Sequence, residues 1–441
     1  MALTILSGAL CGLTAVSFHL AIGKAEALFI DRALAAPHFS WVYWCILTPA
    51  LGGLVVGLAL RFWVPGAVGS GVPQVKAAYA LRAGYIPMRD AFGKFALSVI
   101  QLGTGASSGR EGPTVQICAG ISSWLARAAS LSRESQRRMA AVGVAAGIAA
   151  AFNAPIAAVT FTLEEVIGDL DQTMLSGVIV AAAIAAAVER SILGQHPVFE
   201  IPRAYTLVAA SSLLSYAVLG LLSSILAVAF TDSLLSLRAG FKRFTAMPKW
   251  AHPMLGGLGT GTLAVLAITC VQRNGVTGSG YSTLALALAG SLPLKAMLVL
   301  CLLKFAATAF SYGSGSVGGI FAPSLFLGGM LGGAVGWVDV NIFHHPADSM
   351  GAFALVGMGA VFAGIIRAPM TSVLIIFEMT GSYGLVLPLM IANMSAYLLA
   401  RHWRPRAIYE ALLEQDGVFL PHGKPVTPED LTHDLPSEVP P

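Results

Sequence analysis

One charged pair stands inside an otherwise apolar part of the chain, in the segment Gly109-Arg110-Glu111-Gly112-Pro113. A carboxylate at membrane depth is energetically costly, so such residues usually face a transport pathway or a charged partner. The flanking glycines allow close backbone approach to a ligand, and Pro113 suits the first turn of a helix. We therefore expect a helix over 113–124 whose free N–H groups form an anion site beside Glu111. The alternative is a glycine-rich turn with an Arg–Glu salt bridge at the water interface.

Two other segments share this pattern of a glycine-flanked loop followed by a proline: Gly69-Ser70-Gly71-Val72-Pro73 and Gly319-Ile320-Phe321-Ala322-Pro323. Three helix N-termini directed at one point would supply N–H donors and partial positive charge without a full cation. Ser70 and Tyr409 would add neutral hydroxyl donors. Such a site suits transport, because an ion that is held too tightly does not leave.

The composition assigns these segments to membrane helices. Hydrophobic residues make up 56% of the chain, charged residues 11%, and the mean hydropathy is +0.76. A soluble domain carries about 25% charged residues, so we predict an all-α polytopic membrane protein. At about 20 residues per span, there is room for ten or more membrane segments. The first apolar stretch begins at residue 3, and we expect it to be a retained helix rather than a signal peptide.

The chain also repeats itself at long range. Three pairs of residues are each 214 positions apart, and two further pairs are 210 apart: Gly143/Gly357, Pro155/Pro369 and Glu164/Glu378, then Gly109/Gly319 and Pro113/Pro323. We predict a first membrane repeat over 1–204, a second over 205–413, and a short polar C-terminal tail over 414–441. Matching interruptions in two halves are typical of transporters whose site lies between the repeats. The sequence alone does not show whether the repeats are inverted.

With these motifs in order, the chain resembles the CLC family of voltage-gated-type chloride channels and proton/chloride exchangers. The resemblance covers about residues 1–412 and rests on the following segments: 69–73 (GSGVP), 109–116 (GREGPTVQ), 318–323 (GGIFAP), and 152–155 (FNAP) followed by Glu164-Glu165. It implies two inverted repeats of tilted and half-length helices, and a homodimer with one pathway per subunit. Nothing after residue 413 could hold the paired cytoplasmic CBS domains of larger members, so the bacterial type is expected.

The resemblance also implies roles for individual residues of the anion site. The hydroxyls of Ser70 and Tyr409 would bind the central anion, and the backbone amides of Ile320 and Phe321 would complete its site. Glu111 would be the external gate, whose carboxylate competes with chloride. Its neighbours Arg110 and Gly112 are counted with the anion-binding segment.

A second set of residues is implied for proton transfer. Glu165 would be the internal proton-transfer carboxylate, at a position that the exchangers of the family keep acidic. Glu164 beside it, like its repeat partner Glu378, has a more structural interpretation. Gln74 and Lys76 depart from the family pattern, since many relatives have a Glu at the first position and some bacterial relatives an acid at the second. Lys76 is therefore a candidate basic neighbour of Glu165.

The function that these residues favour is proton-coupled chloride/proton antiport. The alternative is a passive chloride channel of the same fold, and Glu165 is the residue that distinguishes the two. We expect chloride and protons as substrates, membrane lipid as surroundings, no cofactor, no metal site and no nucleic-acid partner. An enzyme is not expected, because the G-x-S-x-G match at 105–109 lacks triad partners. The expected location is a bacterial inner membrane, as an integral multi-pass protein.

Overall fold

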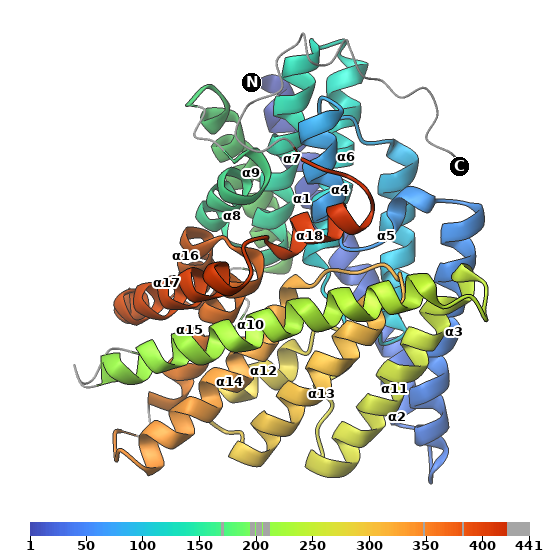
Figure 1. Cartoon of the computed structure of the whole chain (residues 1–441). Coiled ribbons are helices and arrows are strands. Elements are labelled where there is room, and N and C mark those ends of the chain that lie inside the picture. Colours follow the sequence, from blue (N-terminus) through green and yellow to red (C-terminus); the bar gives the residue numbers. More distant parts are fainter. Residues whose placement is uncertain are drawn as a thin grey trace.

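The computed structural model describes residues 1–168, 172–194, 199, 205, 212–346, 349–381 and 383–420, and helices form most of them (Figure 1). In the first half these are α1 (Ala2–Glu26), η1 (Ala27–Asp31), α2 (Arg32–Leu34), α3 (Ser40–Phe62), η2 (Pro65–Ala67), α4 (Val72–Leu81), α5 (Met88–Gly103), α6 (Glu111–Ala128), α7 (Arg133–Phe152), α8 (Pro155–Phe161), η3 (Thr162–Ile167) and α9 (Gln172–Leu193). In the second half they are α10 (Ser212–Arg243), η4 (Lys249–Ala251), α11 (His252–Val271), α12 (Tyr281–Leu288), α13 (Leu294–Gly313), α14 (Phe321–Asn341), α15 (Ser349–Ile366), α16 (Pro369–Thr380), η5 (Tyr383–Leu385), α17 (Val386–Trp403) and α18 (Ile408–Gln415). The prediction of an all-α chain is confirmed.

Eight helices in the described residues are long and apolar enough to cross a membrane: Ala2–Leu34, Ser40–Phe62, Met174–Leu193, Ser212–Arg243, Lys249–Val271, Leu294–Gly313, Phe321–Asn341 and Ser349–Ile366. The chain is therefore an integral, multi-pass membrane protein. The number is below the ten or more expected, because part of the apolar sequence forms half-length helices. At 1.5 Å rise per residue, the 10 residues of α4 and the 8 of α12 cannot cross a hydrocarbon layer of about 30 Å.

Two helix pairs break in the same way at positions 214 residues apart. α7 ends at Phe152, its C-cap Asn153 adopts the left-handed conformation with φ 53°, and α8 starts at Pro155. α15 is followed by Arg367 with φ 72°, and α16 starts at Pro369. Proline fits the first turn of a helix because its missing N–H is not needed there. The sequence repeat thus corresponds to a repeated break that starts the half-length helices α8 and α16.

The two half-length helices are capped by carboxylates from each other's half of the chain. Glu378 accepts hydrogen bonds from the N–H groups of Ile156 (3.0 Å) and Ala157 (2.7 Å) at the start of α8. Glu164 accepts from the N–H groups of Met370 (3.1 Å) and Thr371 (2.8 Å) at the start of α16. Each half of the chain thus supplies one carboxylate that caps a helix of the other half. These carboxylates accept from N–H groups that have no partner within their own helix.

The predicted boundaries of the repeats stay predictions. The boundary at 204/205 falls next to residues outside the described part of the chain, as does the tail from residue 421 onward. At the other boundary, α18 continues to Gln415, two residues beyond 413.

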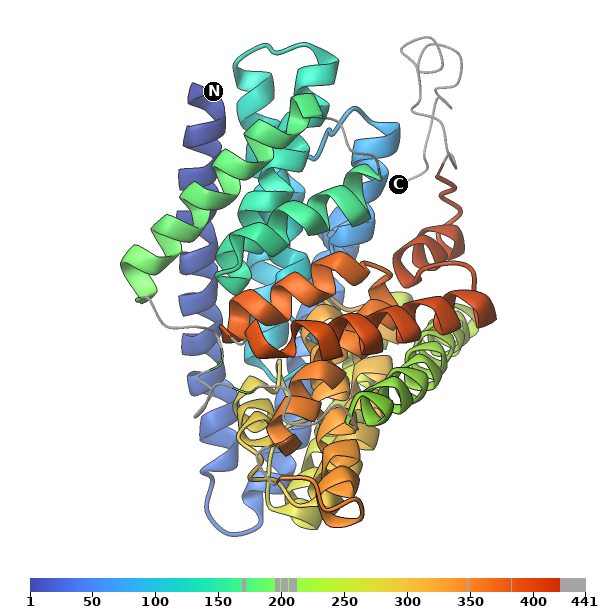
Figure 2. The same ribbon diagram turned by 90° about the vertical axis from the view of Figure 1, so that its left-hand side faces the viewer.

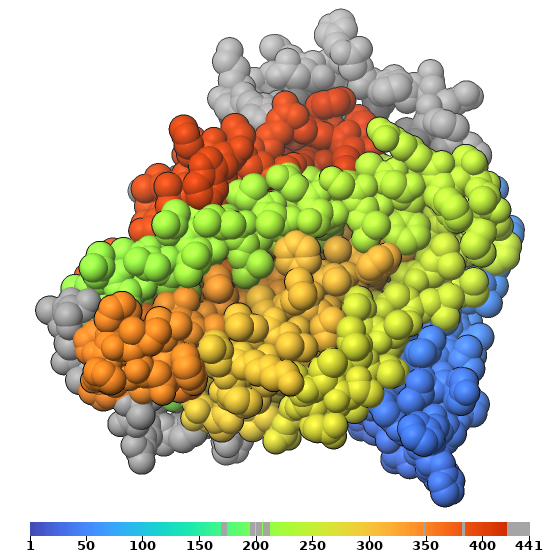
Figure 3. Space-filling model, turned by 60° about the horizontal axis from the view of Figure 1, so that its bottom comes forward, coloured from blue at the N-terminus to red at the C-terminus, as the bar shows by residue number. Residues whose placement is uncertain are grey.

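The helices of the two halves pack around a buried centre. α1 stands upright along one side and packs against α7 and α9 (Figure 2). α10 crosses the molecule obliquely and packs against α13, α15 and α17 (Figure 1). Figure 3 shows a face built mainly by the second half, with the first half visible at one edge. α6, α14 and α15 are buried along almost their whole length, so the loops at the N-termini of α6 and α14 lie inside the protein.

Candidate functional site

Backbone hydrogen bonds bring the three glycine-flanked loops together. Gly109 and Gly319 each donate to the carbonyl of the other at 2.7 Å. Gly69 donates to the Ser316 carbonyl at 3.0 Å, and its own carbonyl accepts from Gly318 at 3.1 Å. These bonds join the loops before α4, α6 and α14, so the N-termini of the three helices meet at one place. The residues predicted from the sequence as one site are therefore neighbours in the structure.

Gly112 lies directly against the loop that carries Ser70. A Cβ atom at residue 112 would stand 2.5 Å from the Ser70 carbonyl oxygen and 2.6 Å from its hydroxyl oxygen. Any side chain at this position would therefore push the α4 loop away. The close approach explains the need for glycine and puts Ser70 beside the start of α6.

Ser70 and Tyr409 are fully buried, each with an exposed fraction of 0%. Neither hydroxyl makes a hydrogen bond of normal geometry within the described part of the chain, and the two hydroxyls lie close enough to interact with each other. Tyr409 is the second residue of α18, which packs against α4. Leaving a buried polar group unpaired costs about 1–3 kcal/mol, so two such hydroxyls indicate donors kept for a ligand.

Ile320 and Phe321 form the start of α14 and are also fully buried. The first N–H groups of a helix have no partner within that helix, and those of α14 begin at this point. The Phe321 ring packs against Phe152, Phe161 and Phe362, with ring centroids 5.1, 5.4 and 4.4 Å away. This aromatic cluster fixes the backbone of the loop and surrounds it with apolar side chains.

Glu111 is the first residue of α6, with Arg110 as the N-cap, so the helix starts two residues before the expected position. Its carboxylate is fully buried, and Oε1 accepts a hydrogen bond from the Tyr281 hydroxyl at 2.7 Å. Oε2 has no hydrogen-bond partner among the described residues. Among those residues there is likewise no ion pair between Arg110 and Glu111, which excludes the Arg–Glu salt bridge at a water interface.

A second buried carboxylate, Glu165, lies on η3 with 4% of its side chain exposed. It accepts a hydrogen bond from Lys76 Nζ at 2.9 Å, and the same Nζ lies 3.2 Å from Glu410 Oε1. Glu410 follows Tyr409 on α18, and its side chain is 32% exposed. Lys76 is thus the direct partner of Glu165, and it connects this carboxylate to a more accessible one.

Gln74, whose role the sequence left open, holds the loop that carries Ser70. Its Oε1 accepts from the Gly71 N–H at 2.9 Å, and its Nε2 donates to the Val68 carbonyl at 3.1 Å. Gln74 thus serves as a neutral cap at the N-terminus of α4.

Sequence reasoning missed two buried lysines, Lys94 and Lys304, which are 210 positions apart and both 0% exposed. Lys94 donates to the carbonyls of Ala67 (2.7 Å) and Gly69 (2.8 Å), in the segment that leads into Ser70. Lys304 donates to the carbonyls of Val276 (3.0 Å) and Gly278 (2.7 Å), at the start of a second Gly-Ser-Gly loop over 278–280. The sequence did hold a signal for this pair: each lysine lies in an apolar segment, and the two are separated by the same 210 positions as Gly109 and Gly319.

Comparison with known proteins agrees with this arrangement. The family model described as "Voltage gated chloride channel" matches residues 52–401. The chain is 34% identical to a protein of Ralstonia nicotianae named as a ClcB-like chloride channel protein, over 88% of this chain and 89% of that protein. It is 30% identical to the "H(+)/Cl(-) exchange transporter ClcA" of Salmonella typhimurium, over 92% of this chain and 86% of that protein.

Solved structures are similar over nearly the whole chain. A slow cyanobacterial Cl-/H+ antiporter superposes with a TM-score of 0.86 at 25% identity, covering 94% of this chain and 97% of that one. A eukaryotic CLC transporter shares the fold with a TM-score of 0.78 at 21% identity, covering 94% of this chain and 73% of that one. The family model, the relatives and the arrangement of the three loops agree, and the chain belongs to the voltage-gated chloride channel (CLC) family.

Proposed function

We propose that this protein is a proton-coupled chloride antiporter. The observation that carries the proposal is a pair of buried hydroxyls, Ser70 in the loop before α4 and Tyr409 on α18, that have no hydrogen-bond partner among the described residues. Glu111, whose buried carboxylate starts α6, lies near both. Relatives named as H(+)/Cl(-) exchange transporters and a similar Cl-/H+ antiporter structure support the same activity.

The central anion site would use neutral donors. Ser70 and Tyr409 donate their hydroxyl hydrogens to the anion, and the backbone amides of Ile320 and Phe321 add two further donors. Arg110 and Gly112, on either side of Glu111, belong to the same anion-binding segment, and Gly112 lies directly against Ser70. Helix N-termini contribute about half a positive charge each, so they attract chloride without holding it as an ion pair. Binding of this strength lets the anion leave again.

Glu111 would act as the gate because it lies at the N-terminus of α6, where an anion is favoured. As a carboxylate it competes with chloride for the same N–H groups. When it takes up a proton it no longer competes, and it carries the proton while chloride passes. This alternation couples the two ions.

Glu165 would transfer the proton on the inner side. It is buried and paired with Lys76, and Lys76 also contacts Glu410. The side chain of Glu410 is 32% exposed, so this chain of contacts leads from the buried carboxylate toward the surface. Each proton that reaches Glu165 weakens its ion pair with Lys76, which remains paired with Glu410. The lysine therefore keeps a charged partner during the cycle.

The assembly and its organisation are part of the same proposal. We propose a homodimer with one pathway in each subunit, two membrane repeats over 1–204 and 205–413, and a short polar tail over 414–441. Lipid surrounds the dimer, and no cofactor takes part in the cycle.

Reconstitution in liposomes tests the proposal. An imposed chloride gradient is expected to drive protons against their own gradient in vesicles that contain the wild-type protein. Glu111→Gln and Glu165→Gln are each expected to keep chloride flux and lose proton movement. Chloride flux without any coupled proton movement in the wild type would contradict antiport and support a passive chloride channel instead.

A further inference from the structure

The hydroxyl of Tyr281 is the hydrogen-bond partner of the gate carboxylate within the described residues, at 2.7 Å from Glu111 Oε1. We propose that Tyr281 relays protons between Glu111 and a cavity beside it, an inference that rests on the proposed antiport. The argument depends on the cavity, on the fixed position of the tyrosine, and on the burial of Glu111.

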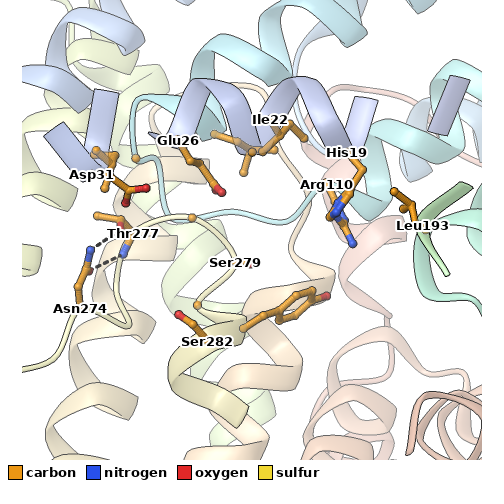
Figure 4. Close-up of a pocket in the computed structure, with 18 of the residues that line it drawn as sticks. His19, Ile22, Glu26, Asp31, Arg110, Leu193, Asn274, Thr277, Ser279 and Ser282 are labelled. Carbon is orange, nitrogen blue, oxygen red and sulfur yellow. Dashed lines mark hydrogen bonds between the residues drawn. The ribbon is translucent and has the colours of Figure 1, made fainter. Parts of the chain in front are cut away.

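The cavity, which we call the vestibule, has a volume of about 540 Å³. Its wall is formed by α1, by the loop and first turn of α12, and by the N-cap of α6, through residues that include Glu26, Ser279, Tyr281 and Arg110. In Figure 4, Ile22 and Glu26 of α1 lie across the vestibule from Ser279 and Ser282. Polar and charged side chains make up much of this wall, so the vestibule is suited to hold water.

Glu111 is absent from the described lining of the vestibule, whereas Tyr281 is part of it. The exposed fraction of Glu111 is 0%, and its second oxygen, Oε2, has no hydrogen-bond partner in the described part of the chain. Tyr281 therefore joins the two, because it lines the vestibule and its hydroxyl donates to the carboxylate. This is the structural basis for a relay.

Both the backbone and the ring of Tyr281 are held in place. It is the first residue of α12, directly after the Gly278-Ser279-Gly280 loop, where Gly280 has φ 79°. The loop is fixed by Lys304, which donates to the Gly278 carbonyl at 2.7 Å. The ring packs edge-on against Phe199, with centroids 5.2 Å apart.

The same construction appears in the first half of the chain, where it serves the anion. There, Lys94 holds the Gly69-Ser70-Gly71 loop and presents the Ser70 hydroxyl next to Gly112. In the second half, Lys304 holds the corresponding loop, and Tyr281 presents its hydroxyl to Glu111. The Ser70 hydroxyl comes from the first loop and the Tyr281 hydroxyl from the residue that follows the second loop. They thus reach adjacent residues of α6, one for the anion and one for the proton.

The proposed step is a concerted transfer through one hydroxyl group. The O–H bond of Tyr281 breaks as its proton moves to Glu111 Oε1, while the tyrosine oxygen accepts a proton from a hydrated proton in the vestibule. The tyrosine is neutral before and after the step, and one proton moves from the vestibule to the carboxylate. Release of a proton from Glu111 follows the same path in reverse.

Several charged or titratable groups act on this step from the surrounding elements. Arg110, the N-cap of α6, lies near both Tyr281 and Glu189 of α9. Lys304 of α13 lies near both Glu111 and Glu26 of α1. Tyr409 of α18 also interacts with Glu111. Lys304 is a cation near the carboxylate, and Arg110 is a cation near the tyrosine in the wall of the vestibule.

Tyr281→Phe tests the relay, since it removes one oxygen atom and keeps the ring. In liposomes, coupled exchange is expected to slow at least about tenfold at neutral pH, and the difference from wild type should shrink in acid, where protons are plentiful. Tyr216→Phe is the matched control, because this buried tyrosine stacks on Phe353 with ring centroids 4.1 Å apart, away from Glu111. It should exchange at the wild-type rate.

A double mutant separates the relay from a structural role. In Glu111→Ala, the gate side chain is gone, so adding Tyr281→Phe should leave the chloride flux unchanged. An equal loss of chloride flux with and without the Glu111 side chain would mean that Tyr281 only supports the fold. A wild-type rate and pH profile in Tyr281→Phe would also overturn the relay. If the wild type itself moves no coupled protons, it is the antiport proposal that fails.

Discussion

Glu164 and Glu165 are adjacent in sequence, yet the structure predicts different phenotypes when each is changed to glutamine. Glu164 turns toward α16, where its Oε2 accepts from the Thr371 N–H (2.8 Å) and from the Thr371 hydroxyl (2.6 Å). Glu165 turns toward Lys76 at 2.9 Å. We expect Glu164→Gln to lower stability and to keep proton coupling, and Glu165→Gln to remove proton coupling.

The size of the stability loss follows from the contacts of Glu164. Hydrogen bonds to a charged group contribute about 1.5–3 kcal/mol, and a helix N-cap contributes about 0.5–2 kcal/mol. An amide keeps one acceptor oxygen, so only part of this is lost. Met370 beside the cap is 64% exposed, which favours the lower end of the range. We therefore expect a loss of about 1–2 kcal/mol in the free energy of unfolding.

The assay combines thermal unfolding in detergent with paired ion flux in liposomes. Glu378→Gln is the matched control, because it weakens the reciprocal cap at Ile156 and Ala157 in the same way and should cost a similar amount. Unchanged stability in Glu164→Gln together with lost coupling would refute the assignment of Glu164 as a cap. Full coupling in Glu165→Gln would show that the proton leaves by another route.

Further predictions concern the anion site, the inner ion pair and the buried lysines. Ser70→Ala combined with Tyr409→Phe should weaken chloride binding at least about tenfold in calorimetric titration, since each hydroxyl donates to a charged ligand; wild-type affinity would count against this site. Lys76→Met should change the pH dependence of proton flux with little effect on chloride affinity, because the lysine contacts Glu165 and Glu410 rather than the anion site; an unaltered pH profile would make the lysine merely structural. Lys94→Met should destabilise the protein and weaken chloride binding, because three carbonyls of the Ser70 loop lose their donor; normal affinity in the folded variant would mean that the loop holds its shape without it.

The place where the three loops of the proposed anion site meet could be predicted, because each loop is marked by a local motif. Each loop combines glycines with a proline near the start of a helix, and this pattern encodes a helix N-terminus regardless of the rest of the fold. The break at Asn153 and Arg367 was likewise visible, since proline follows each position by two residues. The sequence did not predict that Glu164 and Glu378 would cap each other's helices, because that contact joins residues more than 200 positions apart.

The parts that were missed depend on single long-range contacts. Tyr281 lies 170 positions from Glu111, and no local pattern marks a tyrosine as the partner of a distant carboxylate. Lys94 and Lys304 were visible as charges in apolar helices, but their targets are backbone carbonyls, which carry no sequence signal. A buried lysine needs acceptors for its N–H donors, and the fold supplies three carbonyls for Lys94 and two for Lys304.

The most direct test of the central claim is the simultaneous measurement of chloride and proton flux from the same vesicles. With a chloride gradient and no initial pH difference, the wild type should move protons opposite to chloride at a ratio that stays constant as the gradient is varied. Glu111→Gln should move chloride with no protons. A wild-type protein that moves chloride alone, or a Glu111→Gln variant that keeps the wild-type ratio, would contradict coupled exchange through this carboxylate.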